Sequence, residues 1–166
     1  MKAYMALAYK KGALGRVLDN LIKMNLTQQD VFLLLGPFDI LVQLRELANL
    51  NEFISKWFDP IRTMTPTEPL IEKTQTLIVI SEGKSFTEQP YAFLFFNTQP
   101  RNLEQVQQDL QSIPQVLSAE TVFGLFDVIC AVRARDQADL IRLISQIQEK
   151  VPHIQGTVTA IVASIY

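Results

Sequence analysis

The chain has 166 residues, of which 15 are basic and 17 acidic, so its formal net charge is −2. This length fits one or two domains, and the balanced charge offers no basic field for a phosphate backbone or an anionic membrane surface. A single cysteine excludes an intramolecular disulfide, no signal segment opens the chain, and no apolar stretch approaches the ~20 residues of a membrane span. We therefore expect a cytoplasmic protein that binds neither nucleic acid nor membranes directly.

The first half of the chain predicts six elements in the order β-α-β-β-α-β. Apolar runs that end at turn residues predict the strands, and apolar residues at helical spacing predict the helices. The turn pair Gly36-Pro37 joins the middle two strands as a hairpin, and Asn49 with Glu52 is typical of a capping box. The predicted elements are strand 2–9, helix 14–22, strands 31–35 and 38–44, helix 50–58, a loop containing Pro60, Pro66 and Pro69, and strand 71–80.

The second half predicts the same order of elements. Asn102 with Gln105 indicates a second capping box, and the linker-like composition of residues 82–89 separates the two halves. We therefore predict a first domain at 1–81, a linker at 82–89 and a second domain at 90–166. The predicted elements of the second half are strand 91–96, helix 103–113, strands 116–123 and 126–133, helix 138–150 and strand 154–165.

The two halves are copies of one unit. Gly36-Pro37-Phe38-Asp39-Ile40 returns as Gly124-Leu125-Phe126-Asp127-Val128, and Ile71-Glu72-Lys73-Thr74-Gln75-Thr76 returns as Ile154-Gln155-Gly156-Thr157-Val158-Thr159. A period of about 85 residues indicates tandem small domains, because solenoid repeats recur at roughly 20–50 residues.

The repeated element order predicts an α+β fold. Two right-handed βαβ crossovers place both helices on one face of a four-stranded antiparallel sheet, which is the ferredoxin-like arrangement. The strands at 31–35, 77–80 and 92–96 are apolar on both faces, whereas a solvated sheet face would be polar at alternate positions. We expect the sibling copy to cover the second face. The result is an intrachain pseudo-dimer of the dimeric α+β barrel type, with the two sheets stacked.

Few residues offer catalytic chemistry. The single histidine, His153, lies in a turn without a second ligand at metal-binding spacing, and Cys130 lies in the middle of an apolar strand. No phosphate-binding loop or nucleophile elbow is present in the sequence. The sequence therefore predicts no cofactor, no metal and no enzymatic activity.

The repeated hairpin and final strand are the remaining candidates. In Gly-x-Phe-Asp, the glycine allows a tight turn, and the aspartate leaves a carboxylate at the rim of the domain, where it can accept hydrogen bonds from an ammonium group or from turn amides. Each final strand carries two threonines at i and i+2, on one sheet face, which strand propensity alone also explains. The candidate residues are Gly36, Asp39, Gly124 and Asp127, with Thr74, Thr76, Thr157 and Thr159.

The second copy resembles a known family. Val122-Phe123-Gly124-Leu125-Phe126-Asp127 follows Ile113-Pro114-Gln115-Val116 and precedes the segment from Val151 to Thr159. This series resembles the effector-binding (RAM) domain of the Lrp/AsnC transcription regulators almost from end to end. The first copy resembles it more weakly, because it lacks both Pro-x-Val turns.

The resemblance implies ferredoxin-like domains that dimerise through their sheets, assemble into rings and bind small effectors, often amino acids, near the Gly-x-x-Asp hairpin. It implies that all eight candidate residues bind the ligand. Family regulators begin with a helix-turn-helix of about 50 residues, whereas this sequence starts at the first strand. We therefore expect a stand-alone tandem module that binds an amino acid and acts as a homo-oligomer or through Lrp/AsnC-type regulators.

Two alternatives fit the same sequence. A cofactor-independent enzyme of the dimeric α+β barrel type would hold an aromatic substrate in an apolar cavity, and the ten phenylalanines permit such a cavity. A structural protein-interaction module would have no ligand pocket at either place.

Overall fold

The computed structural model describes residues 1–163. By their contacts these residues form two compact units, one of residues 1–78 with Ala163 and one of residues 79–162. Ala163 belongs to the first unit because its backbone N–H donates to the carbonyl of Leu33 at 2.8 Å. The domain limits expected from the sequence, 1–81 and 90–166 with a linker at 82–89, stay a prediction. The predicted strand to residue 165 ends outside the described residues.

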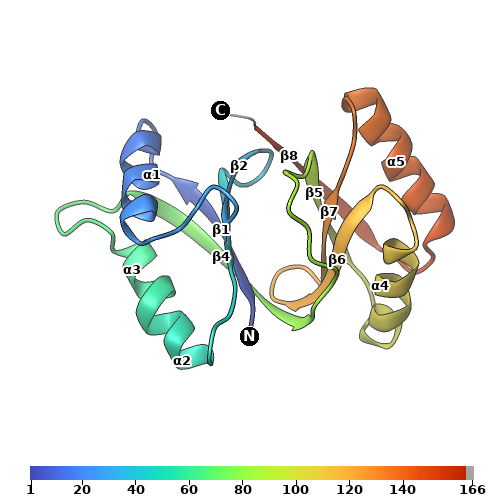
Figure 1. Ribbon diagram of the computed structural model, residues 1–166, viewed down its shortest axis with the longest axis horizontal. Coiled ribbons are helices and arrows are strands. Elements are labelled where there is room, and N and C mark those ends of the chain that lie inside the picture. Colours follow the sequence, from blue (N-terminus) through green and yellow to red (C-terminus); the bar gives the residue numbers. More distant parts are fainter. Residues whose placement is uncertain (164–166) are drawn as a thin grey trace. The chain divides into compact units, whose positions relative to one another are not determined.

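The first unit is one antiparallel sheet with helices on one face (Figure 1). The strand order is β2-β3-β1-β4, and the order of elements confirms the prediction from the sequence. The elements are β1 Ala3–Tyr9, α1 Leu14–Lys23, β2 Val31–Leu35, β3 Ile40–Leu44, α2 Leu50–Glu52, the π-helix η1 Phe53–Phe58, α3 Asp59–Arg62 and β4 Ile71–Ser81, whose residues from 79 on are counted with the second unit.

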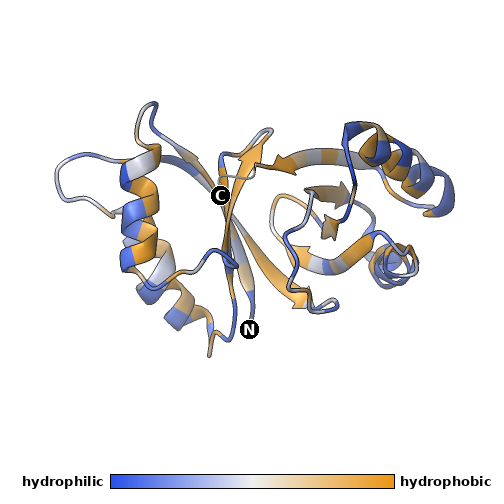
Figure 2. Cartoon of the chain, turned by 45° about the horizontal axis from the view of Figure 1, so that its top comes forward, coloured by the Kyte–Doolittle hydropathy of each residue, from blue (hydrophilic) through white to orange (hydrophobic). Residues whose placement is uncertain are grey.

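The core of the first unit lies between this sheet and its helices. Met5 and Leu7 of β1 and Val42 of β3 are fully buried there against Val17 and Leu21 of α1. Figure 2 shows the matching pattern of the helices, which carry apolar residues along one side and polar residues along the other. Period-2 strands and period-3.6 helices thus bury their apolar sides in the same layer.

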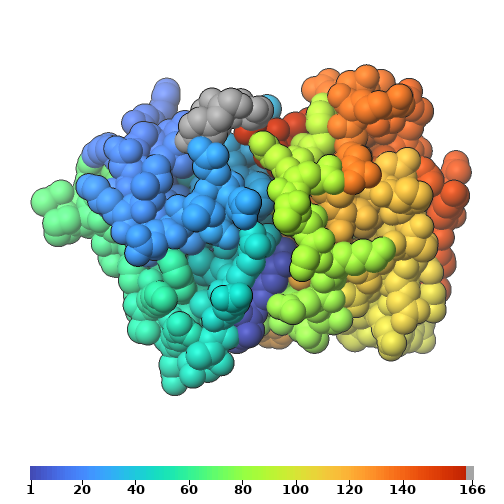
Figure 3. Space-filling view, in the orientation of Figure 1, coloured from blue at the N-terminus to red at the C-terminus, as the bar shows by residue number. Residues whose placement is uncertain are grey.

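The second helical segment runs further than the sequence predicts. It begins at Leu50, where the Asn49 side chain accepts the N–H of Glu52 at 2.9 Å and confirms the predicted cap. The prediction that it ends at Phe58 is wrong, because α2, η1 and α3 continue without a break to Arg62. Pro60 lies inside this continuous segment, where α3 follows η1, so the helix lacks one backbone N–H there. The predicted loop therefore shortens to residues 63–70, which project from this unit (Figure 3).

The second unit has the same order of strands and helices around one antiparallel sheet. Its strand order is β8-β5-β7-β6, and its core packs Leu94, Phe96 and Cys130 of the sheet against Val106 of α4 and Leu143 of α5. The elements are β5 Ala92–Asn97, the 3₁₀ turn η2 Pro100–Asn102, α4 Leu103–Gln111, β6 Val116–Phe123, β7 Val128–Val132, α5 Gln137–Lys150 and β8 Gly156–Val162.

The helix starts of the second unit differ from the prediction. Asn102 makes no capping hydrogen bond, because its backbone (φ −105°, ψ −2°) already belongs to the 3₁₀ turn that begins at Pro100. The cap in this unit stands at the other helix, where the Asp136 side chain accepts the N–H of Asp139 at 2.8 Å. The capping-box prediction at Asn102 is therefore wrong.

On the central strands β1 and β5, the sheet face turned away from the helices is apolar, while the neighbouring strands place the buried side chains of Gln43 and Glu120 on it. Alternation along β1 and β5 places Tyr4 and Ala6, and likewise Phe93 and Phe95, on this face. The two-sided apolar pattern seen in the sequence is therefore a property of both sheets. Among residues 1–163, no helix is both long and apolar enough to cross a membrane.

Candidate functional site

The two repeated aspartates make the same hydrogen bonds. The Oδ2 atom of Asp39 accepts the backbone N–H of Tyr9 at 3.1 Å, and that of Asp127 accepts the N–H of Thr98 at 3.0 Å. Their own N–H groups donate to the carbonyls of Leu7 and Phe96. Each aspartate thus ties its hairpin to the end of the neighbouring strand rather than to its own turn. Both carboxylates are half-buried, and within residues 1–163 no donor reaches their Oδ1 atoms.

The two hairpin glycines share a backbone conformation as well. Gly36 and Gly124 both have φ of 156°, at the edge of the range that side chains disfavour. This conformation turns the chain so that the aspartate three residues later reaches the neighbouring strand end. The repeated sequence therefore has a repeated geometry, and the role of these residues in binding a ligand stays a prediction.

Thr98 links the hairpin of the second unit to a second turn. Its backbone holds Asp127, and its hydroxyl donates to the carbonyl of His153 at 2.7 Å. The N–H of Gln155 donates to Asn97 at 2.8 Å beside it. Sequence reasoning missed Thr98, because the equivalent residue of the first unit is Tyr9 and the repeat therefore gave no signal. A polar residue at the end of an otherwise apolar strand was the available clue.

The four predicted threonines lie on the strands beside β1 and β5. Thr74 pairs with Leu7 and Thr76 with Met5, and in the same way Thr157 pairs with Phe96 and Thr159 with Leu94. The aspartates lie on the opposite side of those central strands, roughly 10 Å away across two strand spacings. The structure thus brings Thr74 and Thr157 to the same end of the sheet as the aspartates, and leaves Thr76 and Thr159 one pleat further in.

A pocket of about 350 Å³ opens at this end of the second unit. It lies between the end of α5 and the start of β8, where the turn that Thr98 holds connects them. Its volume is within the range of small-molecule sites, about 300–1,000 Å³. Amide, hydroxyl and aliphatic groups line it, and none of them is charged. The lining residues are Gln148, Val151, Ile154, Gln155, Gly156 and Thr157.

His153 and Cys130 take the places expected from the sequence. His153 is exposed in the turn before β8, with φ of 75°. Cys130 is fully buried, and burial raises the pKa of its thiol, which keeps it protonated and unreactive. Within the described residues, no three histidine, cysteine or acidic side chains gather closely enough to hold a metal ion.

The model of the Lrp/AsnC ligand-binding domain matches residues 91–166, which include the hairpin, the turn at His153 and the pocket. The chain belongs to the Lrp/AsnC ligand-binding domain family. A hypothetical protein of Pyrococcus horikoshii, PHS023, is 31% identical over 45% of this chain and 89% of its own, with a TM-score of 0.41. No curated protein matches the chain.

Two solved structures share the fold over almost the whole chain. The siroheme decarboxylase NirDL, in complex with an iron-uroporphyrin III analogue, is 10% identical over 99% of this chain and 71% of its own, with a TM-score of 0.67. A monooxygenase-like protein of Lactobacillus acidophilus is 10% identical over 98% and 92%, with a TM-score of 0.55. At this identity the likeness shows the α+β fold alone.

Proposed function

We propose that this Lrp/AsnC-family chain is a non-enzymatic regulatory module that binds a small molecule, with amino acids as the favoured class. The observation that supports it most is that only one oxygen of the Asp127 carboxylate accepts a hydrogen bond from residues 1–163. One oxygen is held by Thr98, which fixes the side chain, and the other has no donor within residues 1–163. A fixed, half-buried carboxylate is suited to accept hydrogen bonds from an ammonium group.

The ligand site that we propose joins this carboxylate to the pocket beside Thr157. Asp127 supplies the charged side, in the hairpin that Gly124 turns, while Thr157, with Thr159 behind it, supplies hydroxyl groups on the neighbouring strand. In the first unit the counterparts are Gly36, Asp39, Thr74 and Thr76. An amino acid offers both an ammonium group and a carboxylate to such a polar site.

The two copies are not equivalent in this proposal. Pro37 has no N–H, whereas Leu125 offers one beside Asp127. Tyr9 replaces Thr98, so the hydroxyl bond that fixes the second turn has no counterpart at Tyr9. We therefore propose that the second copy binds the ligand more tightly.

Ligand binding would act through assembly. The apolar residues on the sheet faces turned away from the helices support stacking of the copies as an intrachain pseudo-dimer. Exposing such residues to water is unfavourable. The ligand would then change association of the chain with itself or with Lrp/AsnC-type regulators.

Thermal unfolding in the presence of each of the twenty amino acids tests this function. A ligand at a hundred times its dissociation constant adds about 2.7 kcal/mol of stability, which is measurable. With the ligand found, calorimetry compares Asp127→Asn and Asp39→Asn. We expect Asp127→Asn to weaken binding roughly ten- to a hundredfold, with a smaller loss for Asp39→Asn. Asparagine keeps an oxygen for the Thr98 N–H, so folding should barely change. Equal losses would refute the inequivalence, and unchanged binding in both variants would refute the site.

A cofactor-independent enzyme is the second candidate, favoured by the fold shared with NirDL and by phenylalanines on the second sheet face, such as Phe93 and Phe95. The same unfolding assay separates the two. Stabilisation by iron-uroporphyrin III, with none by any amino acid, would support the enzyme and contradict the sensor.

A further inference from the structure

A second pocket lies in the first unit, on its helical side. It has a volume of about 470 Å³, which is also within the range of ligand sites. It lies between the last turn of α1 and the segment formed by η1, α3 and the two residues after them. Its lining residues are Asn20, Lys23, Met24, Ser55, Asp59, Pro60, Thr63 and Met64.

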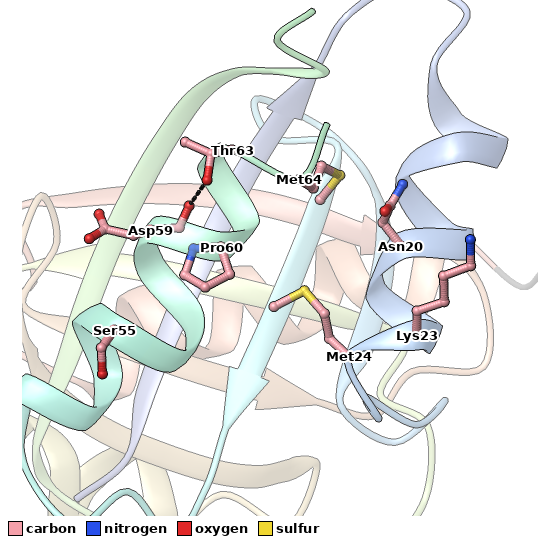
Figure 4. A pocket seen from close by; sticks show the side chains of 8 residues that line it. All are labelled: Asn20, Lys23, Met24, Ser55, Asp59, Pro60, Thr63 and Met64. Carbon is pink, nitrogen blue, oxygen red and sulfur yellow. Dashed lines mark hydrogen bonds between the residues drawn. The ribbon is translucent and has the colours of Figure 1, made fainter. Parts of the chain in front are cut away.

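One wall of this helical pocket carries a free cation. Lys23 stands in the last turn of α1, and within residues 1–163 its ammonium group has no ion-pair partner. Asn20 lies one turn earlier on the same wall and donates its amide N–H to the carbonyl of Arg16 at 2.8 Å, which holds its side chain in place. Figure 4 shows both side chains on α1, extending along the helix.

The middle of the helical pocket is apolar and adaptable. The side chains of Met24 and Met64 lie between the two helices, with the ring of Pro60 opposite (Figure 4). Methionine is flexible and polarisable, so a pair of them accommodates apolar groups of different shape. Asp59 also lines the pocket, but its carboxylate points away from α1 (Figure 4). Of the two charged residues that line the pocket, Lys23 is therefore the one on the α1 side.

The π-helix contributes one residue to the far wall, and the others belong to α3 and the turn after it. Ser55 lies within η1, and its hydroxyl donates to the carbonyl of Asn51 at 2.9 Å. π-helical turns are rare and occur frequently at functional sites. In the second unit the corresponding helix, α5, is a regular α-helix from Gln137 to Lys150. The π-turn therefore sets the first unit apart from its sibling.

We propose that the helical pocket binds a small monocarboxylate with an apolar chain. The carboxylate lies at Lys23, and the chain lies on Met24, Met64 and Pro60. This site is separate from the hairpin site, so each proposal stands or fails without the other.

Methyl NMR of the full chain labelled with [ε-¹³C]methionine tests the proposal, because the chain has only four methionines. Hexanoate is the probe, and hexan-1-ol and hexylammonium are its neutral and cationic counterparts. We expect hexanoate to shift the signals of Met24 and Met64 and to leave that of Met5, which is fully buried in the core of the same unit. The shifts should saturate at lower concentration with hexanoate than with the other two probes.

Lys23→Gln should weaken hexanoate binding roughly two- to fivefold, the range of a partly exposed ion pair, and leave hexan-1-ol binding unchanged. Lys150→Gln is the matched control, since Lys150 is also an exposed lysine in the last turn of a helix. Equal affinity for hexanoate and hexylammonium, or equal hexanoate affinity in both variants, would overturn the proposal. So would the absence of shifts at Met24 and Met64.

Discussion

At the scale of single residues, Thr98 shows how one side chain connects two turns. It is almost fully buried, and its hydroxyl donates to the carbonyl of His153 while its backbone holds Asp127. The hairpin and the turn before β8 therefore keep a fixed distance, which the proposed ligand site needs.

Thr98→Val should lower the free energy of unfolding by about 1 kcal/mol, because the carbonyl of His153 loses its donor while the shape of the side chain is kept. Urea unfolding measures this. Thr121→Val is the matched control, since Thr121 is also buried but its hydroxyl makes no hydrogen bond to residues 1–163. A loss of the same size in both variants would show that the bond to His153 contributes nothing.

Cys130 is buried between Ile129 and Ala131 in β7, and burial raises the pKa of its thiol. The thiol therefore stays protonated, and a reagent in solution cannot reach it in the folded chain. We expect a thiol reagent such as Ellman's reagent to leave the folded chain unlabelled at pH 8 and to label it stoichiometrically in 6 M guanidinium chloride. Rapid labelling without denaturant would contradict the burial of this strand.

The repeat in the sequence marked the aspartates and glycines of the hairpins as candidates, but it gave no sign of Thr98. Asp39 and Asp127 recur at fixed spacing from a glycine, so duplication itself marked them. Thr98 acts through a carbonyl of a turn 55 residues further along the chain. Only the folded sheet brings that carbonyl near, and no local pattern records it.

At the scale of elements, the π-helix η1 follows from the positions of its aromatic residues. Phe53 and Phe58 are five residues apart, and their ring centroids are 5.8 Å apart. On a regular α-helix two such residues point about 140° away from each other. The wider π-turn brings both rings to the core, together with Trp57. Helical periodicity could predict the helix, but it could not predict the turn that breaks that periodicity.

Phe58→Ala should therefore destabilise the chain by about 1–3 kcal/mol, since the ring is partly buried and packs on Phe53. Differential scanning calorimetry measures the change. Phe123→Ala is the control, because Phe123 is 73% exposed at the end of β6 and should cost little. If the two variants unfold alike, Phe58 does not hold the π-turn against the core.

At the scale of the whole molecule, the segment between the copies is fastened to the second unit. The side-chain amide of Gln107 donates to the carbonyls of Ser81 at 3.2 Å and Ala119 at 3.0 Å, and the N–H of Gly83 donates to Glu120 at 3.1 Å. A Cβ on Gly83 would lie 2.4 Å from the hydroxyl of Ser118, so only glycine fits there. Composition alone predicted a linker at 82–89, whereas the structure shows specific contacts at its start.

The exposed residues that follow, Lys84 and Ser85, offer a place to cut the folded chain. A protease site inserted between them separates the copies without removing any element of either unit. If the sheets stack through their apolar second faces, the nicked halves should elute together in size-exclusion chromatography and separate only in denaturant, because separation would expose Tyr4, Phe93 and Phe95 to water. Two halves that elute as folded, soluble monomers would refute the pseudo-dimer and leave two independent units on one chain.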